Sequence, residues 1–352
     1  MVINFVSRIS FNDIKGVGKM IVKKTEFQQL HSCVEESTGN EKNICEITAI
    51  KNGSIVYEDY WHGYRRGDTL NVMSITKSVM ALLIGIAIDK GLIKSIGQKV
   101  LEFFPDYQVK RGEKTIYDVT LRHLLTMTAP YKYKSEPWTK VCTSDDWTKA
   151  ALNLLGGRKG ITGEFKYSTL GIQILSGVIA NASGMKVVDF ANAYLFEPLG
   201  IPRHINKEDR SKEDQFNFLM SKEPKGNVWY ADPQNVNTAG WGLALSANDL
   251  AAIGLMCLQK GIYNGKRIVT EEWIDALSTP YIDLDEGFGK MSYGFLWWII
   301  DASKRIYAAI GDGGNVIYVN EAKGICVGIA GTFKPRIFDR VQFIQNKIEP
   351  LL

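Results

Sequence analysis

The sequence has no large excess of either charge, no long hydrophobic run and no compositional bias. Its 352 residues include 42 basic and 38 acidic side chains, a net charge of +4. This balance does not indicate nucleic acid or an acidic membrane surface as a partner. The longest apolar run, residues 79–88, has ten residues, whereas a membrane-spanning helix needs roughly 20. With 45% hydrophobic and 23% charged residues, the composition excludes disorder, collagen and coiled coil and leaves a globular protein of one or two domains.

Cysteine and histidine are too few and too scattered to form a recognisable site. The five cysteines lie far apart without a C-x-x-C pair, and the four histidines lack the spacing of metal ligands. We therefore expect reduced, mostly buried thiols and neither metal nor cofactor. The first eight residues do not have the basic start and apolar stretch of an export signal. This indicates a cytoplasmic protein, or one from which a signal has been trimmed, and no pattern indicates an oligomeric state.

Runs rich in β-forming residues lie near both ends of the chain, and helical patterns lie between them. Residues 44–50 and 53–60 flank an Asn-Gly turn that is typical of a hairpin. Toward the C-terminus, β-rich runs cover residues 293–300, 305–310, 315–320 and 325–331, and an amphipathic helix is expected over 336–348. The sequence therefore predicts an α/β (α+β) fold. One sheet domain comprises residues 1–105 and 240–352, and a mostly helical insertion covers residues 106–239.

A serine and a lysine stand three residues apart at the start of the most apolar helical pattern, residues 74–90. This spacing places Ser74 and Lys77 on one face of the helix. A partly desolvated lysine can lose its proton near neutral pH and activate a serine hydroxyl as a nucleophile. The alternative is that Ser74 caps the helix and Lys77 is solvated. A second S-x-x-K, from Ser183 to Lys186, lies in a turn where capping explains the serine, so the motif alone is ambiguous.

Two further segments contain residue types that are able to act with such a pair. Tyr167 stands at the entrance of a predicted helix and could exchange protons if nearby cations lower its pKa, but packing alone also explains it. Residues 310–318 form a glycine-rich segment that enters a strand and could bring backbone N–H groups against a substrate. An ordinary hairpin turn is the alternative for this segment. It lacks the pattern of a phosphate-binding loop.

The ordered combination of these segments carries a resemblance to a known family. Ser74-x-x-Lys77, Tyr167-Ser168-Thr169 and Asp312-Gly313-Gly314 resemble the three motifs of the penicillin-recognising serine hydrolases. The likeness is greatest to the branch of class C β-lactamases and D-alanyl-D-alanine carboxypeptidases, which includes esterases and 6-aminohexanoate-oligomer hydrolases. It covers most of the chain beyond about residue 50, with supporting stretches at residues 124–128, 239–250, 264–269 and 293–298.

The resemblance implies a β-lactamase-like fold, with an antiparallel sheet flanked by helices and an active site between the sheet domain and the helical insertion. It implies that Ser74 attacks a carbonyl and is acylated, while Lys77 and Tyr167 share the proton transfers. The backbone N–H groups of Ser74 and Asn315 would form the oxyanion hole. The substrate-binding residues implied by the motifs are Thr169, Asp312, Gly313, Gly314 and Asn315.

Two positions depart from the family's pattern. Thr169 stands where the family usually has asparagine, so an amide that would hold the substrate is replaced by a hydroxyl. Asp312 stands where lysine or histidine usually faces a substrate carboxylate. Two like charges at about 4 Å repel each other by a few kcal/mol at an effective dielectric near 20. We therefore expect weak turnover of β-lactams and a preference for neutral or cationic esters or amides.

These observations predict a metal-independent serine hydrolase that acts through a Ser74 acyl-enzyme on a small-molecule ester, amide or lactam. An esterase or amidase is favoured over a true lactamase. Two alternatives remain: a non-catalytic protein that uses the pocket to bind a ligand or partner, and a structural subunit. Both would lack an activated serine, so the reactivity of Ser74 distinguishes them from the enzyme.

Overall fold

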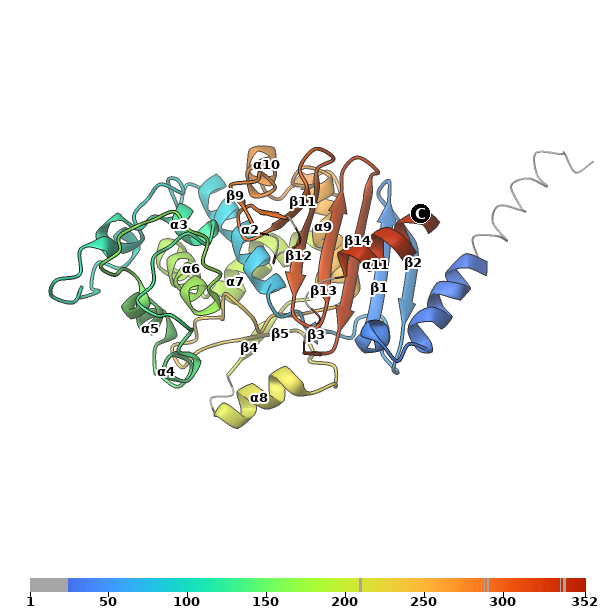
Figure 1. Ribbon diagram of the computed structural model, residues 1–352, viewed down its shortest axis with the longest axis horizontal. Coiled ribbons are helices and arrows are strands. Elements are labelled where there is room, and N and C mark those ends of the chain that lie inside the picture. The colour runs from blue at the N-terminus through green and yellow to red at the C-terminus, as the bar shows by residue number, and fades with distance from the viewer. Residues whose placement is uncertain are drawn as a thin grey trace, which may run out of the picture.

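A computed structural model describes residues 25–208, 211–285, 287, 289, 291–335, 337 and 340–352. Its centre is an eight-stranded antiparallel sheet with the order β2-β1-β14-β13-β12-β11-β10-β9 (Figure 1). The strands of this sheet are β1 (Ile44–Lys51), β2 (Ser54–Tyr60), β9 (Ile282–Asp283), β10 (Ser292–Tyr293), β11 (Trp298–Asp301), β12 (Ile306–Gly311), β13 (Asn315–Asn320) and β14 (Ile325–Gly331). The α/β fold class with a large antiparallel sheet is confirmed.

Strands that lie far apart in the sequence pair with each other in this sheet. β1 and β2 form the expected hairpin, in which Asn52 and Gly53 both have positive φ angles, 50° and 84°, as its tight turn requires. β1 then pairs with β14, from near the other end of the chain. The sheet is therefore complete only when both ends of the sequence are in place.

The expected strand over residues 293–300 is wrong in one respect. The run is two short strands, β10 and β11, which pair with each other through the turn at residues 294–297. The Gly294 N–H donates to the Trp297 carbonyl across this turn at 2.8 Å. Leu296 has a φ of 59° and donates its N–H to the Leu125 carbonyl at 2.9 Å. A contact with a distant segment thus breaks a run that local β propensity makes continuous.

Hydrophobic side chains cover both faces of the sheet. On one face, α2 (Ile75–Asp89) and α9 (Ala247–Leu258) pack in the larger core. On the other face, a smaller core joins Leu30 and Val34, from a helix at residues 25–35, to Ile344 and Ile348 near the C-terminus. Among the described residues, the C-terminal helical segment begins with α11 (Val341–Phe343), later than the expected residue 336, which lies outside the described residues.

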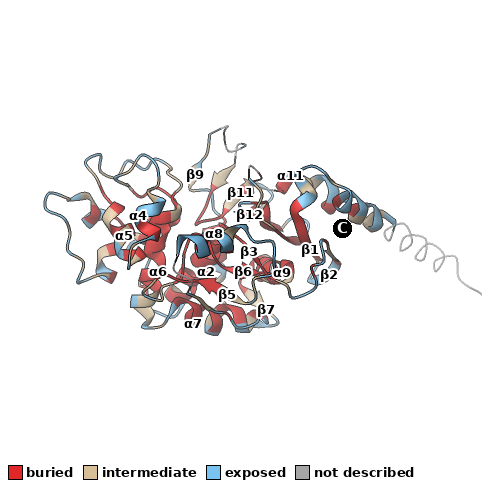
Figure 2. Ribbon diagram, turned by 90° about the horizontal axis from the view of Figure 1, so that it is seen from below, coloured by how far each residue is buried: buried red, intermediate tan, exposed pale blue. Residues whose placement is uncertain are grey.

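The regular elements between the two parts of the sheet are mainly helices. α6 (Thr169–Ser183) contacts α2, and Figure 2 shows both helices as largely buried. The remaining α-helices are α3 (Leu121–Leu125), α4 (Trp138–Cys142), α5 (Trp147–Leu154), α7 (Val187–Ala191), α8 (Lys212–Met220) and α10 (Glu271–Leu277). Three small two-stranded sheets pair β3 (Leu70–Asn71) with β6 (Ala244–Leu245), β4 (Ile205–Lys207) with β5 (Val228–Tyr230), and β7 (Ile262–Tyr263) with β8 (Lys266–Arg267). The short 3-10 or π segments are Asn40–Asn43, Val100–Phe103, Thr115–Asp118, Asn192–Phe196, Glu197–Leu199, Ile344–Ile348 and Glu349–Leu351.

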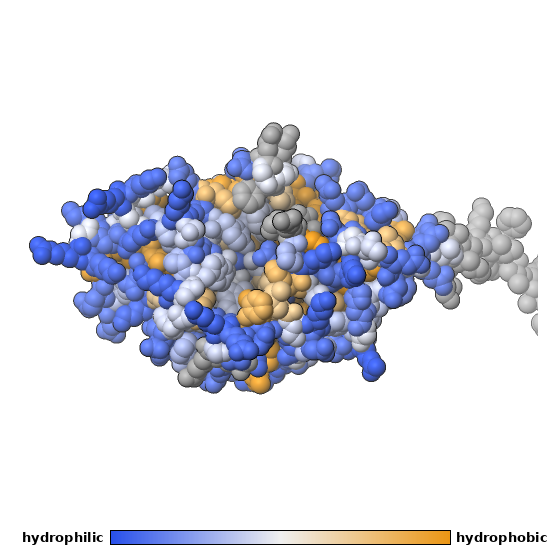
Figure 3. All heavy atoms as spheres, turned by 60° about the horizontal axis from the view of Figure 1, so that its bottom comes forward, coloured by the Kyte–Doolittle hydropathy of each residue, from blue (hydrophilic) through white to orange (hydrophobic). Residues whose placement is uncertain are grey.

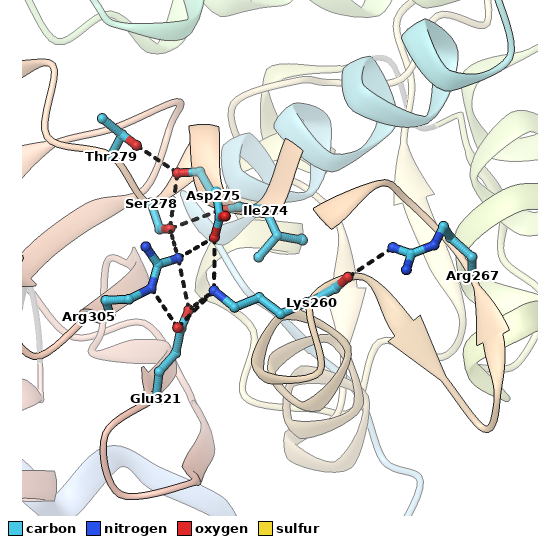
Figure 4. Close-up of polar contacts among 8 residues, drawn as sticks. All are labelled: Lys260, Arg267, Ile274, Asp275, Ser278, Thr279, Arg305 and Glu321. Atoms are coloured by element: carbon cyan, nitrogen blue, oxygen red, sulfur yellow. Dashed lines mark hydrogen bonds and ion pairs between the residues drawn. The ribbon is translucent and has the colours of Figure 1, made fainter. Parts of the chain in front are cut away.

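A polar network attaches α10 to the chain at one end of strands β12 and β13 (Figure 4). Lys260 and Arg305 both contact Asp275 of α10, at 2.9 and 2.5 Å. The same two cations contact Glu321, beyond the end of β13, at 2.8 and 2.5 Å. Two cations and two carboxylates therefore alternate in one cluster that joins four segments.

Within the described part of the chain, no single helix is both long and apolar enough to cross a bilayer, and one bent pair, residues 169–183 and 187–199, meets the criteria by length and composition only. The domain boundaries at residues 105/106 and 239/240 stay a prediction.

Candidate active site

Ser74 and Lys77 lie at the start of α2 and contact each other directly. Lys77 Nζ donates to Ser74 Oγ at 2.7 Å and to the Gly240 carbonyl at 2.8 Å. Ser74 occupies the N-cap position of α2, but its side chain makes no capping hydrogen bond. Lys77 is 1% exposed. Both alternatives for this motif, a capping serine and a solvated lysine, are therefore wrong.

The second S-x-x-K, Ser183 to Lys186, has the same spacing, but its lysine is not buried. Ser183 Oγ donates to the Ile179 carbonyl at 2.7 Å and accepts from the Met185 N–H at 3.1 Å. Lys186 is exposed to solvent. Local hydrogen bonds fully account for this serine, so tertiary burial, and not the motif, distinguishes the pair at Ser74.

The backbone before Ser74 is held in an uncommon conformation. Met73 has a φ of 52°, in the left-handed region that side chains other than glycine rarely adopt. Asn71 Oδ1 accepts from the Met73 N–H at 3.1 Å and from the Gly242 N–H at 3.1 Å. One buried asparagine thus joins the turn that presents the serine to the segment that holds Lys77. The sequence gives no local signal for this role.

Burial determines the protonation of Lys77. Loss of hydration lowers the pKa of Lys77 to about 7, and the nearby carboxylates of Glu136 and Asp312 oppose this decrease. A substantial fraction of the amine is therefore unprotonated near neutral pH. A neutral amine at hydrogen-bond distance from a serine hydroxyl is able to accept its proton.

Tyr167 is the third side chain in contact with Ser74 and Lys77. It lies two residues before α6, and its hydroxyl is hydrogen-bonded to Ser74. Lys77 Nζ is 4.9 Å from the centre of its ring. The ring also packs against Tyr293 and Trp298. Burial raises the pKa of Tyr167 above its ordinary value, so the phenol keeps its proton at neutral pH. The packing and chemical interpretations of this tyrosine are thus compatible.

Glu136 fixes the segment that follows Tyr167. Its Oε1 atom accepts from the Leu170 N–H at 2.8 Å and from Ser168 Oγ at 3.0 Å. Ser168 in turn caps α6 by accepting from the Gly171 N–H at 2.8 Å. These contacts set where Tyr167 enters the site. Nothing in the sequence near Glu136 indicates this contact, because its partners are about 30 residues away along the chain.

The glycine-rich segment forms the turn between β12 and β13 and lies against the start of α2. A Cβ atom on Gly311 would lie 2.2 Å from the Val72 carbonyl and 3.1 Å from the Ser74 nitrogen, so only glycine allows this approach. Asn315 holds the turn: its Nδ2 donates to the Asp312 carbonyl at 2.9 Å, and its Oδ1 accepts from the Gly331 N–H at 2.9 Å. The segment is a hairpin turn, and it also borders the serine.

Gly313 and Gly314 pack against the chain that follows β14. A Cβ atom on Gly313 would lie 2.9 Å from the Thr332 carbonyl, and one on Gly314 would lie 2.5 Å from Arg340 Nε. Close packing therefore explains these two glycines. Contact of Gly313, Gly314 and Asn315 with a substrate stays a prediction.

A cleft of about 510 Å³ opens over Ser74. Thr169 and Asp312 line it together with Ser74, so three residues from distant parts of the chain share one cavity. Trp138 of α4 and Phe216 of α8 also line it and are 44% and 60% exposed. Figure 3 shows a group of hydrophobic side chains near the middle of the face it presents, which is otherwise mostly hydrophilic. Burial raises the pKa of Asp312, and Lys77 opposes this shift.

The cleft holds no evident metal site, because the described residues contain no group of three or more His, Cys, Asp or Glu side chains arranged to bind a cation. The polar groups gathered at Ser74 are the Lys77 amine, the Tyr167 phenol and, in the lining of the cleft, the carboxylate of Asp312.

Comparisons with known proteins agree with this geometry. Residues 46–342 match the family model described as Beta-lactamase. The chain is 25% identical over 305 residues to a 6-aminohexanoate-dimer hydrolase from Paenarthrobacter ureafaciens, covering 80% of this chain and 70% of the relative. Among solved structures, a family VIII carboxylesterase aligns with a TM-score of 0.64 at 17% identity, over 91% of this chain and 95% of that one. A D-stereospecific amidohydrolase from Streptomyces aligns with a TM-score of 0.61 at 14% identity, over 87% and 93% of the two chains.

Proposed function

The chain belongs to the beta-lactamase family and is a serine hydrolase, and from this premise we propose that it cleaves an ester or amide through an acyl-enzyme on Ser74. The observation that carries the proposal is the 2.7 Å contact between Ser74 Oγ and the buried amine of Lys77. The contrast with exposed Lys186 supports it, because a serine becomes a nucleophile only when a base accepts its proton.

We assign the proton transfers from the pKa shifts of the two partners. The neutral amine of Lys77, whose pKa burial lowers to about 7, accepts the Ser74 proton as Oγ attacks the substrate carbonyl. Tyr167, whose pKa is raised, donates its proton to the leaving group when the carbonyl reforms. The Lys77 ammonium then returns a proton to Tyr167. A water attacks the acyl-enzyme and releases the acid, and the free serine is restored.

The substrate class follows from charge and from the relatives. The Asp312 carboxylate lines the cleft over Ser74 and would repel a carboxylate beside the scissile bond. The Asp312 carboxylate therefore favours substrates whose groups beside the scissile bond are neutral or cationic. The relatives that are named as a dimer hydrolase, a carboxylesterase and an amidohydrolase support an ester or amide over a β-lactam.

Intact-protein mass spectrometry tests this proposal. Wild type and the variants Ser74→Ala and Lys77→Ala are each exposed to a fluorophosphonate and to benzylpenicillin. We expect one fluorophosphonate adduct on the wild type, its loss in both variants and little or no penicillin adduct. Nitrocefin turnover at the rate of an authentic lactamase would contradict the esterase or amidase assignment.

The second S-x-x-K supplies matched controls. Ser183→Ala and Lys186→Ala make the same changes at the same spacing, and both should label like the wild type. A folded wild-type protein that takes no adduct would instead support a pocket used only for binding.

A further inference from the structure

A second cavity of about 520 Å³ lies next to the cleft over Ser74. We call it the lysine cavity. The residues that line it are Lys42, Asn43, Cys45, His62, Gly63, Tyr64, Lys222, Glu223, Pro224, Thr332, Phe333 and Lys334. The mechanism proposed above uses none of them.

Three lysines reach this cavity from three separate segments. Lys42 belongs to the turn before β1, Lys222 follows α8, and Lys334 follows β14. Among the described residues, Glu223 is the one carboxylate that lines the cavity, so the lining carries a net positive charge. No ion pair between described residues involves any of the three lysines. Lys334 Nζ donates to the Gly39 carbonyl at 2.5 Å, which leaves its charge without a counter-ion.

The lysine cavity and the active-site cleft share one wall. Phe333 lines both of them. The chain at Thr332 and Phe333 also lies against Gly313, whose Cβ would be 2.9 and 3.2 Å from these two residues. A buried asparagine fixes this wall, because Asn43 Nδ2 donates to the carbonyls of Gly313 at 2.8 Å and Thr332 at 2.5 Å. The two cavities therefore adjoin at Phe333.

We propose that the lysine cavity binds a carboxylate at the remote end of the substrate. The inference rests on the proposed function and specifies its substrate class: an ester or amide with an anionic group that is distant from the scissile bond. The two cavities differ in the charge of the side chains that line them. Asp312 repels an anion beside Ser74, and the lysines attract one beyond Phe333. The length of the chain between carbonyl and carboxylate should therefore determine reactivity.

The experiment uses 4-nitrophenyl monoesters of succinic, adipic, suberic and sebacic acid, each paired with its neutral methyl-capped diester. The measured quantity is the ratio of kcat/KM for the carboxylate over its capped partner. We expect this ratio to rise with chain length and to exceed one for a long member. In the triple variant with Lys42, Lys222 and Lys334 changed to Gln, the maximal ratio should fall roughly tenfold.

Lys110→Gln is the matched control, since Lys110 is exposed and does not line either cavity. Its ratio should equal that of the wild type. Salt should lower the wild-type preference, because exposed charges are screened. A ratio below one at every chain length, or a ratio that the triple variant leaves unchanged, would overturn the inference while leaving hydrolysis at Ser74 intact.

Calorimetric titration separates this failure from failure of the proposed function. The monoamide of suberic acid, which keeps one free carboxylate, is titrated into Ser74→Ala and into the same protein with the three Gln changes. Tighter binding to the protein that keeps its lysines supports the lysine cavity even if no ester is turned over. Equal affinity for the two proteins argues against it.

Discussion

Lys77 combines two properties that rarely occur together in a lysine: it is 1% exposed, and it contacts a serine hydroxyl. Desolvation favours the neutral amine, whereas Glu136 and Asp312 favour the charged one. The balance leaves a base whose pKa is close to neutral. The burial of this one side chain therefore controls the reactivity of Ser74.

The pH dependence of Ser74 labelling should report the Lys77 pKa. We expect the second-order rate with an uncharged fluorophosphonate to rise about tenfold per pH unit below pH 7 and to level above it, because only the neutral amine accepts a proton. Stopped-flow or quenched mass measurements between pH 5 and 9 give the profile. Lys77→Arg, which stays protonated, should label far more slowly at every pH. A flat wild-type profile would exclude Lys77 as the base.

Asp312→Asn should make the site more tolerant of anions. The ratio of acylation rates for benzylpenicillin over its neutral methyl ester should rise roughly tenfold, because the like-charge repulsion is removed. The same change should move the midpoint of the pH profile lower, since Asp312 helps to keep Lys77 charged. Rates for both penicillins, measured by intact mass, test the first effect. An unchanged ratio would show that Asp312 does not face the substrate.

At the scale of residues, the sequence motifs predict which side chains gather at Ser74 but not which residues position them. Ser74, Lys77 and Tyr167 were predicted from ordered motifs, and the structure brings all three into contact. Asn71 and Glu136 were not predicted. Each acts through one side-chain oxygen on distant backbone N–H groups, and such contacts leave no periodicity or spacing in a sequence.

Contacts between elements also involve a buried carboxyl. Glu46 of β1 is fully buried and accepts from the Ala247 N–H at the start of α9 at 2.7 Å. Its other oxygen has no hydrogen-bond partner among the described residues. Burial raises the pKa of Glu46 to about 8. The Ala247 N–H favours the ionised carboxylate, but loss of hydration outweighs it, so the folded chain is most stable while Glu46 holds its proton.

The free energy of unfolding should decrease as the pH rises. Because the folded-state pKa of Glu46 is above that of the unfolded chain, the folded state binds more protons between about pH 4.5 and 8. The stabilisation is complete below that range and is lost as the pH passes 8. Denaturant unfolding from pH 5 to 9 should show this slope, and Glu46→Gln should reduce it. An equal slope in the variant would assign the effect to another group.

The polar network around α10 allows a second test at the scale of elements. Glu321→Gln leaves Lys260 and Arg305 with Asp275 as their remaining carboxylate in the network. We expect a loss of roughly 1–2 kcal/mol in the free energy of unfolding. Asp301→Asn, which breaks the exposed pair with Lys304, should have a smaller effect on the melting temperature. Equal shifts would mean that the network acts as separate surface pairs.

Element types were predicted well where the local pattern and the tertiary contacts agree. The hairpin of β1 and β2 follows from its Asn-Gly turn. The run at residues 293–300 was wrong because Leu296 contacts Leu125, far away in the sequence. Burial on both sides makes such a run look continuous, and only the folded chain shows where it turns.

At the scale of the whole molecule, the larger hydrophobic core spans the sheet and the helices between its two parts. It contains side chains of α2, α6 and α9 and of the sheet. We therefore expect a single cooperative thermal transition, with equal calorimetric and van't Hoff enthalpies. Differential scanning calorimetry tests this. Two separate transitions would show that the helical insertion unfolds as an independent domain.

The pairing of β1 with β14 has a consequence for synthesis on the ribosome. β1 emerges early, but β14, the strand that must lie beside it, begins only at Ile325 and is made much later. Until then, the hairpin of β1 and β2 has an open edge and apolar side chains on both faces, and open edges favour aggregation. The nascent chain should therefore depend on chaperones until β14 has been made.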